Sequence, residues 1–363
     1  MFGGEFMTTY KIAVLPGDGI GPDVTAEAMK VLEALKQQDA AFEIDFQQFE
    51  WGSEYYLEHG RIMPEDGLEQ LKSFDAILFG AVGDKRVPDE ITIWELIMPI
   101  RKNFQQYVNM RPIRRLAGIE SPLKNEQPID FMVFRENAEG EYSNIGGRLY
   151  QQQSQEMAIQ NTVITKQGVE RIAKYAFEYA QKNNKSKVTS ATKSNAIIHS
   201  MKLWDEVVEK VAEDYGGIEL ESNFIDALAA YFVMRPESFE VVVASNLFGD
   251  ILTDLGAALV GGLGVSPSGN INPDRTFPSM FEAIHGSAPD IAGKGIANPI
   301  AQIWSAALML DHLGRPDLST AIVDAIEQVL QEGRILTPDL GGDSTTQEVG
   351  TAIAEKVKQL IAK

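Results

Sequence analysis

The sequence predicts an α/β protein built on a largely parallel β-sheet. Short apolar segments with β-branched residues recur along the chain and run into polar turns, as in Tyr10–Leu15 and Phe74–Gly83. Segments with helical periodicity lie between them, among them Val24–Leu35 and Gly168–Ala180. Apolar strands that alternate with helices are typical of parallel sheets covered on both faces.

The elements follow in a regular order from the N-terminus. The first strand ends in the glycine-rich turn PGDGIGP, residues 16–22, which precedes the first helix. Three later strands, at Ile129–Asn137, Ser186–Asn195 and Phe239–Asp250, also lead into polar turns, and a further helix is expected at Ser200–Tyr215. Because ligands of such sheets bind at the carboxyl ends of the strands, the residues that follow these strands are the candidate site.

The stretch Tyr142–Thr165 differs from its neighbours. It carries a Gly146-Gly147 pair, a run of three glutamines and a polar alternation typical of exposed strands. We expect a surface hairpin or an arm that contacts another subunit, and the two readings stay open.

Composition excludes several classes of function. The chain has 363 residues, enough for two domains, with 32 basic and 52 acidic residues and a formal net charge of −20. Such acidity disfavours nucleic acid and anionic membranes as partners. With no cysteine and four histidines, any bound metal would need oxygen ligands.

The start of the chain does not have the pattern of a signal peptide. No apolar run reaches the ~18 residues that a membrane helix needs, and the N-terminus lacks a basic segment followed by a long apolar one. We therefore expect a cytoplasmic protein. Residues 1–6 precede a second methionine, Met7, and are expected to be a remnant of cloning.

The glycine-rich turn is a weak candidate for a dinucleotide loop. Its spacing is G-x-G-x-G, it carries the anionic Asp18, and no ribose-binding acid follows at a suitable distance. A structural turn is the favoured reading.

Three arginines are candidates for binding an anion. Arg101 and Arg111 flank a helical stretch, and Arg135 stands at the end of a strong strand. The planar guanidinium suits carboxylates, so the three could clamp a small di-acid. The alternative is that each pairs with one of the many acidic residues of the chain.

Three aspartates are candidates for binding a metal. Asp250 and Asp254 stand four residues apart where a strand passes into a helix, so both can project from one helix face. Together with Asp226 they offer oxygen ligands that suit Mg²⁺ or Mn²⁺. Acids at a helix N-terminus also stabilise the helix dipole, which is the alternative reading.

Two further side chains could transfer protons. Lys193 follows a strand in a polar turn, and a lysine close to a cation has a lowered pKa and can act as a base. Tyr142 offers a phenol that can donate a proton. The alternatives are a solvated lysine and an ordinary half-buried tyrosine.

Taken in order, these motifs resemble the metal-dependent β-decarboxylating dehydrogenases of 2-hydroxy acids, which include isocitrate, 3-isopropylmalate, tartrate and D-malate dehydrogenases. The resemblance runs from Tyr10 to the C-terminus, and its most specific pieces are LPGDGIGP, RENAEGEYSNIGGR, ATKSN, SNLFGDILTDLG and HGSAPDIAGKGIANP. It implies this family's two-domain α/β fold, with a mixed, largely parallel sheet that is not a true Rossmann fold. The implied domains are a cofactor-binding domain of residues 7–106 and 261–363, and a substrate and dimerisation domain of residues 107–260 with an arm near 142–165.

The resemblance also implies roles for the candidate residues. Substrate arginines fall on Arg101, Arg111 and Arg135, the proton-donating tyrosine on Tyr142, the base on Lys193, and the ligands of Mg²⁺ or Mn²⁺ on Asp226, Asp250 and Asp254. In family members the lysine and the first aspartate come from the neighbouring subunit, which implies a homodimer with shared active sites. K⁺ is a further candidate cofactor.

The cofactor would bind to the loop His285, Gly286, Ser287, Ala288, Pro289, Asp290 and Ile291, with Asn298 nearby. Asp290 would accept hydrogen bonds from an adenosine ribose and repel a 2′-phosphate, so NAD is expected rather than NADP.

The substrate is expected to be a small hydroxy di-acid. The helix ITIWELIMPIR places Trp94, Ile97 and Met98 on one side by count, and the bulky Trp94 could fill the space of a branched substituent. The chain looks most like the tartrate and D-malate branch, which implies oxidation of D-malate to pyruvate and CO₂ with tartrate as a second substrate. Ala138 departs from the threonine usual in relatives. The alternatives are a 3-isopropylmalate dehydrogenase and, more remotely, a silent subunit of a hetero-oligomer.

Overall fold

The computed structural model describes residues 8–124 and 127–362, and the chain divides into two units. The first unit consists of Met1–Gln106, Arg115–Lys124 and Ala257–Lys363, and the second of Tyr107–Arg114 and Asn125–Gly256. Residues 1–6, expected to be a remnant of cloning, lie outside the described residues.

The first unit is built on five strands in the order β2-β1-β3-β12-β11. Neighbouring strands are parallel except β11 and β12, which are antiparallel. The strands are β1 (Thr8–Gly17), β2 (Phe42–Gln48), β3 (Ala76–Ala81), β11 (Pro267–Ile271) and β12 (Ser279–Ala283). All residues of β3, β11 and β12 are buried, and all of them are apolar or small except Asn270 of β11 and Glu282 of β12.

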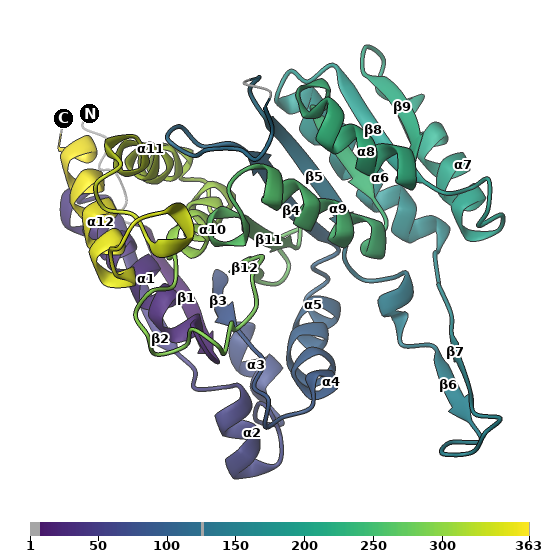
Figure 1. Ribbon diagram of the computed structural model, residues 1–363, viewed down its shortest axis with the longest axis horizontal. Coiled ribbons are helices and arrows are strands. Elements are labelled where there is room, and N and C mark those ends of the chain that lie inside the picture. Colours follow the sequence, from purple (N-terminus) through teal and green to yellow (C-terminus); the bar gives the residue numbers. More distant parts are fainter. Residues whose placement is uncertain (1–7, 125–126, 363) are drawn as a thin grey trace, which may run out of the picture. The chain divides into compact units, whose positions relative to one another are not determined.

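The helices of this unit present apolar stripes to the sheet and to one another. In Figure 1, α1 runs beside α12, and the two helices are in contact. The helices are α1 (Gly21–Gln38), α2 (Ser53–His59), α3 (Gly67–Leu71), α4 (Asp89–Thr92), α5 (Met98–Asn103), α10 (Ile300–His312), α11 (Pro316–Glu332) and α12 (Thr346–Ile361). Helix α10 is buried over most of its length because α1, α11, β11 and β12 all contact it.

Within the described residues, the main sheet of the second unit has the strand order β4-β5-β10-β8-β9, in which β4 and β5 pair antiparallel and the other neighbours are parallel. The strands are β4 (Val108–Arg114), β5 (Asp130–Glu136), β8 (Lys187–Thr192), β9 (Glu219–Phe224) and β10 (Val241–Ala244). The helices are α6 (Lys166–Lys182), α7 (Ser200–Ala212), α8 (Ile225–Met234) and α9 (Asn246–Leu259), the last turn of α9 belonging to the first unit. The predicted mixed, largely parallel sheet architecture is therefore present in both units.

A two-stranded hairpin leaves this unit after β5. Strands β6 (Gly146–Leu149) and β7 (Met157–Gln160) pair antiparallel and are exposed throughout. Figure 1 shows the hairpin extending away from the strands of its own unit. The polar stretch Tyr142–Thr165 thus forms an exposed hairpin, as one of the two sequence readings proposed.

The unit boundaries differ from the expected domains in two short segments. Residues 115–124 and 257–260 were expected in the second domain but belong to the first unit. The reason is local packing: Ala117 N donates to Glu327 Oε1 of α11 at 3.1 Å, and Ser121 Oγ donates to the carbonyl of Leu259 at 2.8 Å. A side chain at Gly118 would collide with the backbone of α11 at Leu330.

Within the described residues, we found no helix with the length and apolarity required to cross a bilayer.

Candidate active site

A cluster of charged side chains in the second unit centres on Asp250 of α9. Arg111 lies in β4, Arg135 lies at the end of β5, and α9 begins two residues after β10 ends. Gly249 lets the helix approach the strand, because a Cβ there would lie 2.7 Å from Arg135 Cβ. The fold thereby brings residues more than a hundred positions apart to one place.

Both arginines of this cluster reach Asp250. Its Oδ1 atom lies 2.6 Å from Arg135 Nη1 and 3.3 Å from Arg111 Nη1. Arg111 Nη1 also donates to Thr253 Oγ1 at 2.6 Å and lies 3.9 Å from Asp254 Oδ1. The arginine side chains are 7% and 3% exposed, whereas Asp250 is 33% exposed, so two buried cations face a carboxylate that solvent can reach.

Asn246 is a member of this cluster that sequence reasoning missed. Its Oδ1 accepts from Arg135 Nη2 at 2.7 Å, and its backbone carbonyl accepts from Arg135 Nε at 2.8 Å. Its Nδ2 donates to the carbonyl of Glu139 at 3.2 Å. An asparagine at the junction between an apolar strand and the following helix was the signal that the sequence offered.

Tyr142 joins the same cluster from the loop after β5. Its hydroxyl donates to Asp250 Oδ2 at 3.1 Å, and the Arg135 guanidinium carbon lies 5.5 Å from its ring centre. The loop is held by Glu136, whose carboxylate accepts from the backbone N–H groups of Ala138 and Glu139, and by Gly140, whose N–H donates to Val163. The phenol therefore lies against the carboxylate that both arginines contact.

Asp254, the second of the two aspartates of α9, has a raised pKa. Partial burial is the main cause, and the neighbouring Asp250 carboxylate adds to it, while Arg111 and Arg135 act in the opposite direction. Asp250 and Asp254 stand one helical turn apart on the same face, as the spacing predicted.

Lys193 and Asp226 form a separate pair in the second unit. Lys193 follows β8, Asp226 is in the first turn of α8, and their Nζ and Oδ1 atoms are 2.6 Å apart. The hydrogen bond from Lys193 lowers the pKa of Asp226. Lys193 Nζ also lies 5.7 Å from the centre of the Phe224 ring.

The three aspartates do not meet within one copy of the chain. Among residues 8–124 and 127–362, no three acidic or histidine side chains are grouped so that they could hold a metal ion. Asp250 and Asp254 nevertheless offer carboxylate oxygens next to one another, and their chemistry fits Mg²⁺ or Mn²⁺. Asp226 offers a third, 70% exposed carboxylate.

The first unit carries the remaining predicted residues. Arg101 of α5 donates from Nη2 to Glu282 Oε1 of β12 at 2.8 Å, and Asn270 of β11 donates to the same oxygen at 2.7 Å. Arg101 Nε is buried without a hydrogen-bond partner among the described residues. Each of the three arginines therefore pairs with a carboxylate, as the alternative reading held, and Glu282 is a partner that the sequence did not reveal.

The helix that carries Trp94 is not a uniform α-helix. Residues Ile93–Ile97 form a π-helical turn between α4 and α5, in which the N–H of Met98 donates to the carbonyl of Ile93. Pro99 lacks the N–H that a regular α-helix needs at its position. The residues counted onto one side differ in exposure: Met98 is buried, while Trp94 and Ile97 are half-buried. The Nζ atom of Lys102 lies 5.3 Å from the centre of the Trp94 ring.

The predicted cofactor loop follows β12. His285 Nδ1 lies 2.9 Å from the carbonyl of Gly286, which leaves Nε2 buried without a partner among the described residues. Burial lowers the pKa of His285, so the ring is neutral and its free nitrogen can accept a hydrogen bond. Asp290 is exposed, whereas Asn298 is buried and donates to Asp339 Oδ2 at 3.0 Å. The loop thus offers an unpaired buried acceptor, His285 Nε2, and an exposed carboxylate, Asp290, and both can accept hydrogen bonds from a ligand's amino and hydroxyl groups.

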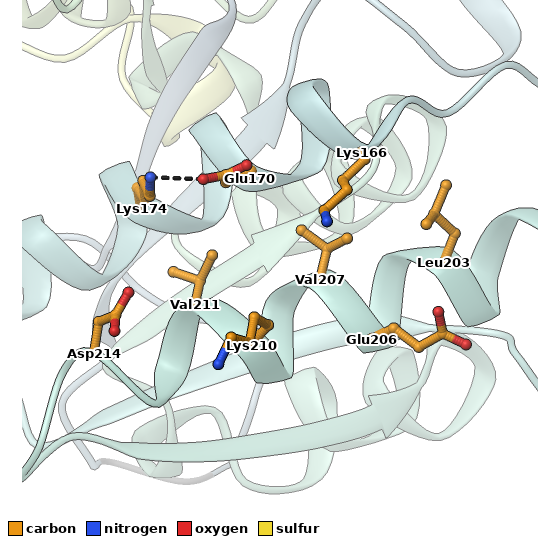
Figure 2. Close-up of a pocket in the computed structure, with 9 residues that line it drawn as sticks. All are labelled: Lys166, Glu170, Lys174, Leu203, Glu206, Val207, Lys210, Val211 and Asp214. Atoms are coloured by element: carbon orange, nitrogen blue, oxygen red, sulfur yellow. Dashed lines mark hydrogen bonds and ion pairs between the residues drawn. The ribbon is translucent and has the colours of Figure 1, made fainter.

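A groove between α6 and α7 contains none of the predicted site residues. Figure 2 shows Lys174 paired with Glu170 on α6, and Val207 and Val211 of α7 pointing toward α6. The groove is lined by Lys166, Glu170, Lys174, Leu203, Glu206, Val207, Lys210, Val211 and Asp214. Three lysines and three acidic residues line the groove, so its lining has no net charge that would attract a charged ligand.

Comparison with known proteins decides the family. The model of the isocitrate/isopropylmalate dehydrogenase family matches residues 11–353. The chain belongs to this family. This dehydrogenase is 53% identical over 355 residues to the probable tartrate dehydrogenase/decarboxylase of Bacillus subtilis (strain 168), with 98% of this chain and 99% of that protein covered. It is 52% identical over 358 residues to the D-malate dehydrogenase (decarboxylating) of Escherichia coli (strain K12), with 96% and 99% covered.

Solved structures agree with this assignment. The crystal structure of isocitrate dehydrogenase from Methylococcus capsulatus matches with a TM-score of 0.88 and 36% identity, and the match covers 96% of this chain and all of that one. The predicted family fold is thereby confirmed for this dehydrogenase. The protein is an enzyme, and relatives that match nearly its whole length are named decarboxylating dehydrogenases.

Proposed function

We propose that this dehydrogenase oxidises D-malate with NAD and decarboxylates the product to pyruvate and CO₂, and that it also oxidises tartrate. The observation that carries the proposal is the convergence of Arg111, Arg135 and Tyr142 on the solvent-accessible Asp250. Buried guanidinium groups recognise carboxylates, and a phenol beside them can supply a proton to a substrate they hold. The names of the relatives support this class of substrate.

In the proposed reaction, Arg111 and Arg135 bind the carboxylates of the substrate, and Arg101 supplies a third cation. Lys193 accepts the proton of the C2 hydroxyl, while NAD, which the loop 285–291 would hold, would supply the acceptor for the C2 hydride. Loss of CO₂ then leaves an enolate, and Tyr142 protonates its C3 carbon, giving pyruvate. Asp226, Asp250 and Asp254 would hold a divalent ion, which as a Lewis acid stabilises negative charge on the C2 oxygen.

The choice of NAD rests on the cofactor loop 285–291. Asp290 is exposed, so its carboxylate is free to accept hydrogen bonds from the two hydroxyl groups of an adenosine ribose. The same charge repels the 2′-phosphate of NADP. The unpaired Nε2 of His285 offers a further acceptor in the same loop.

We also propose a homodimer whose active sites are shared between subunits. Lys193 and Asp226 pair apart from the Asp250 cluster in the described chain, and the three aspartates do not meet there. Most of the large apolar side chains that are exposed belong to the second unit, including Ile145, Leu149, Ile159 and Met234. Exposed apolar residues in such number are typical of a protein interface.

The test is a substrate panel with the purified protein. NADH formation with Mn²⁺ and NAD would be followed for D-malate, L-malate, the tartrate isomers, isocitrate and 3-isopropylmalate, each in K⁺ and in Na⁺ buffer. The ratio kcat/KM is compared because it measures discrimination between transition states. We expect its highest value for D-malate, followed by tartrate. A preference for 3-isopropylmalate would keep the reaction class and contradict the substrate. No NADH from any of these acids would support the silent subunit.

A further inference from the structure

The glycine-rich turn between β1 and α1 contains a buried carboxylate that binds no cation among the described residues. Asp18 is 8% exposed and accepts three hydrogen bonds from uncharged donors. Its Oδ1 accepts from Ser53 N at 2.8 Å, and its Oδ2 accepts from Ser53 Oγ at 2.6 Å and from Gly83 N at 2.9 Å. One side chain thus joins the turn, the start of α2 and the segment after β3.

The glycines of the turn serve this close approach. A Cβ at Gly19 would lie 2.0 Å from the carbonyl oxygen of Ser287, and a Cβ at Gly17 would lie 2.0 Å from that of Ala81. Both glycines have positive φ, 69° and 61° for Gly17 and Gly19. The turn therefore meets protein backbone, in agreement with the structural reading favoured from the sequence.

The contacts continue from Asp18 to the cofactor loop. Gly83, whose N–H is bound by Asp18, accepts with its carbonyl from Ser287 Oγ at 2.6 Å. Ile20 N donates to the carbonyl of Ser287 at 2.9 Å. Ser287 is thereby fixed at its hydroxyl and at its carbonyl by segments that Asp18 holds in place.

The residue after Ser287 shows what this fixation accomplishes. Ala288 has φ of 40°, a left-handed conformation that is strained for a non-glycine residue. Its carbonyl accepts from Ile291 N at 3.0 Å, and Ala288 and Ile291 pack against Ile20 and Val24 of the turn and α1. The contacts of Gly83 and Ile20 with Ser287 help to keep Ala288 in this strained conformation. The turn at Ala288 in turn determines the position of Asp290.

We infer that Asp18 is a positioning residue for NAD binding, acting through Gly83 and Ser287 on the loop 285–291. This inference rests on the proposed function, since it takes that loop as the NAD site. Asp18 does not touch the cofactor in this account. Its effect should therefore fall on NAD affinity and spare the chemistry at the Asp250 cluster.

The decisive variant is Asp18→Asn. An amide of the same shape must place its NH₂ group against either the N–H of Ser53 or the N–H of Gly83, and neither can accept a hydrogen bond. We expect NAD affinity, measured by calorimetric titration, to fall about tenfold. The kcat at saturating NAD and the KM for D-malate should stay within about twofold of wild type.

A second single variant, Ser287→Ala, keeps the test independent of the folding of Asp18→Asn. Ser287→Ala removes the bond to Gly83, and we expect a loss of NAD affinity of similar size. The double variant should bind NAD no more weakly than the weaker single variant, because both changes break one chain of contacts. Asp75→Asn is the matched control: this exposed acid accepts from Lys11 N at 2.7 Å in the same unit, and NAD affinity should not change.

The outcomes separate the two proposals. Normal NAD affinity in both Asp18→Asn and Ser287→Ala, with wild type binding NAD, would overturn the positioning role alone. An equal loss in NAD affinity, kcat and D-malate KM would also overturn it, because a general structural defect explains that pattern. Failure of the wild-type protein to bind NAD would overturn the proposed function and this inference together.

Discussion

Each buried cation of the site lies against an anion. Arg111 and Arg135 share Asp250, and Arg101 has Glu282. A buried guanidinium without a partner would cost several kcal/mol, so the sequence had to provide carboxylates at these places. The same carboxylates keep the arginine forks oriented, which prepares them for the carboxylates of a substrate.

Tyr142→Phe tests the proton donor. The hydroxyl is the only atom removed, and we expect pyruvate release from D-malate to slow by about 10²- to 10⁴-fold, the usual contribution of a positioned acid. Stopped assays for pyruvate, run with NADH absorbance, would measure it. Tyr10→Phe is the control, since the Tyr10 hydroxyl donates to the carbonyl of Leu313 at 3.5 Å in the first unit. Pyruvate release at the normal rate in Tyr142→Phe would refute the role.

His312 predicts a dependence of stability on pH. Burial lowers the pKa of this side chain to about 4 from 6.5, and the charge of Arg275 acts in the same direction. In the unfolded chain, His312 therefore binds a proton below pH 6.5, whereas in the folded protein it binds one only below about pH 4. Stability should fall as the pH is lowered through this range, by roughly 3 kcal/mol at most.

The measurement is urea unfolding of wild type and His312→Gln at several pH values. The variant should lose this part of the slope between pH 6.5 and pH 4, while at pH 8 the difference between the two proteins is independent of pH. Parallel stability curves over the whole range would contradict the assignment.

Single elements illustrate how far local patterns determine structure. The predicted strand Ser186–Asn195 is β8, Lys187–Thr192, and the predicted helix Gly168–Ala180 lies within α6. Apolar periodicity alone located them. The π-helical turn at Ile93–Ile97 was not predicted. It forms because the N–H of Met98 donates to the carbonyl of Ile93, whereas counting along a regular α-helix assumes a bond to the carbonyl of Trp94.

The last helix carries a testable stabilising device. Thr345 Oγ1 accepts from Glu348 N, and Glu348 Oε2 accepts from Thr345 N at 2.7 Å, which is a capping box at the start of α12. We expect Thr345→Ala to lower the free energy of unfolding by about 1 kcal/mol and to leave kcat unchanged. Thr320→Ala, at an exposed position inside α11, is the control and should be close to neutral. Equal urea midpoints for Thr345→Ala and wild type would contradict the capping role.

The cofactor loop offers a prediction about specificity. Replacing Asp290 by Lys and Ile291 by Tyr removes the charge that repels a 2′-phosphate and adds one that attracts it. We expect the ratio of kcat/KM for NADP to that for NAD to rise at least about tenfold, which corresponds to ~1.4 kcal/mol. Steady-state kinetics at fixed D-malate would measure it, and an unchanged ratio would exclude this loop from cofactor choice.

At the scale of the whole molecule, the separation of Lys193 and Asp226 from the Asp250 cluster leads to a complementation test. If the sites are shared, a Lys193→Ala chain paired with a Tyr142→Phe chain forms one site with both defects and one with neither. Co-expression with two affinity tags isolates this hybrid. We expect about half of the wild-type activity per dimer. Hybrids no more active than their parents would show that each chain builds its own site.

The sequence by itself determined the succession of strands and helices, the motifs of the family and the types of residue that its chemistry needs. Local spacing suffices for this, since period and turn chemistry are properties of neighbouring residues. Only the tertiary structure decided which carboxylate each arginine meets, that Asn246 and Glu282 join them, and that Asp18 supports the loop of Ser287. These pairs are joined across tens to hundreds of residues by strand order and helix packing, which no local pattern encodes.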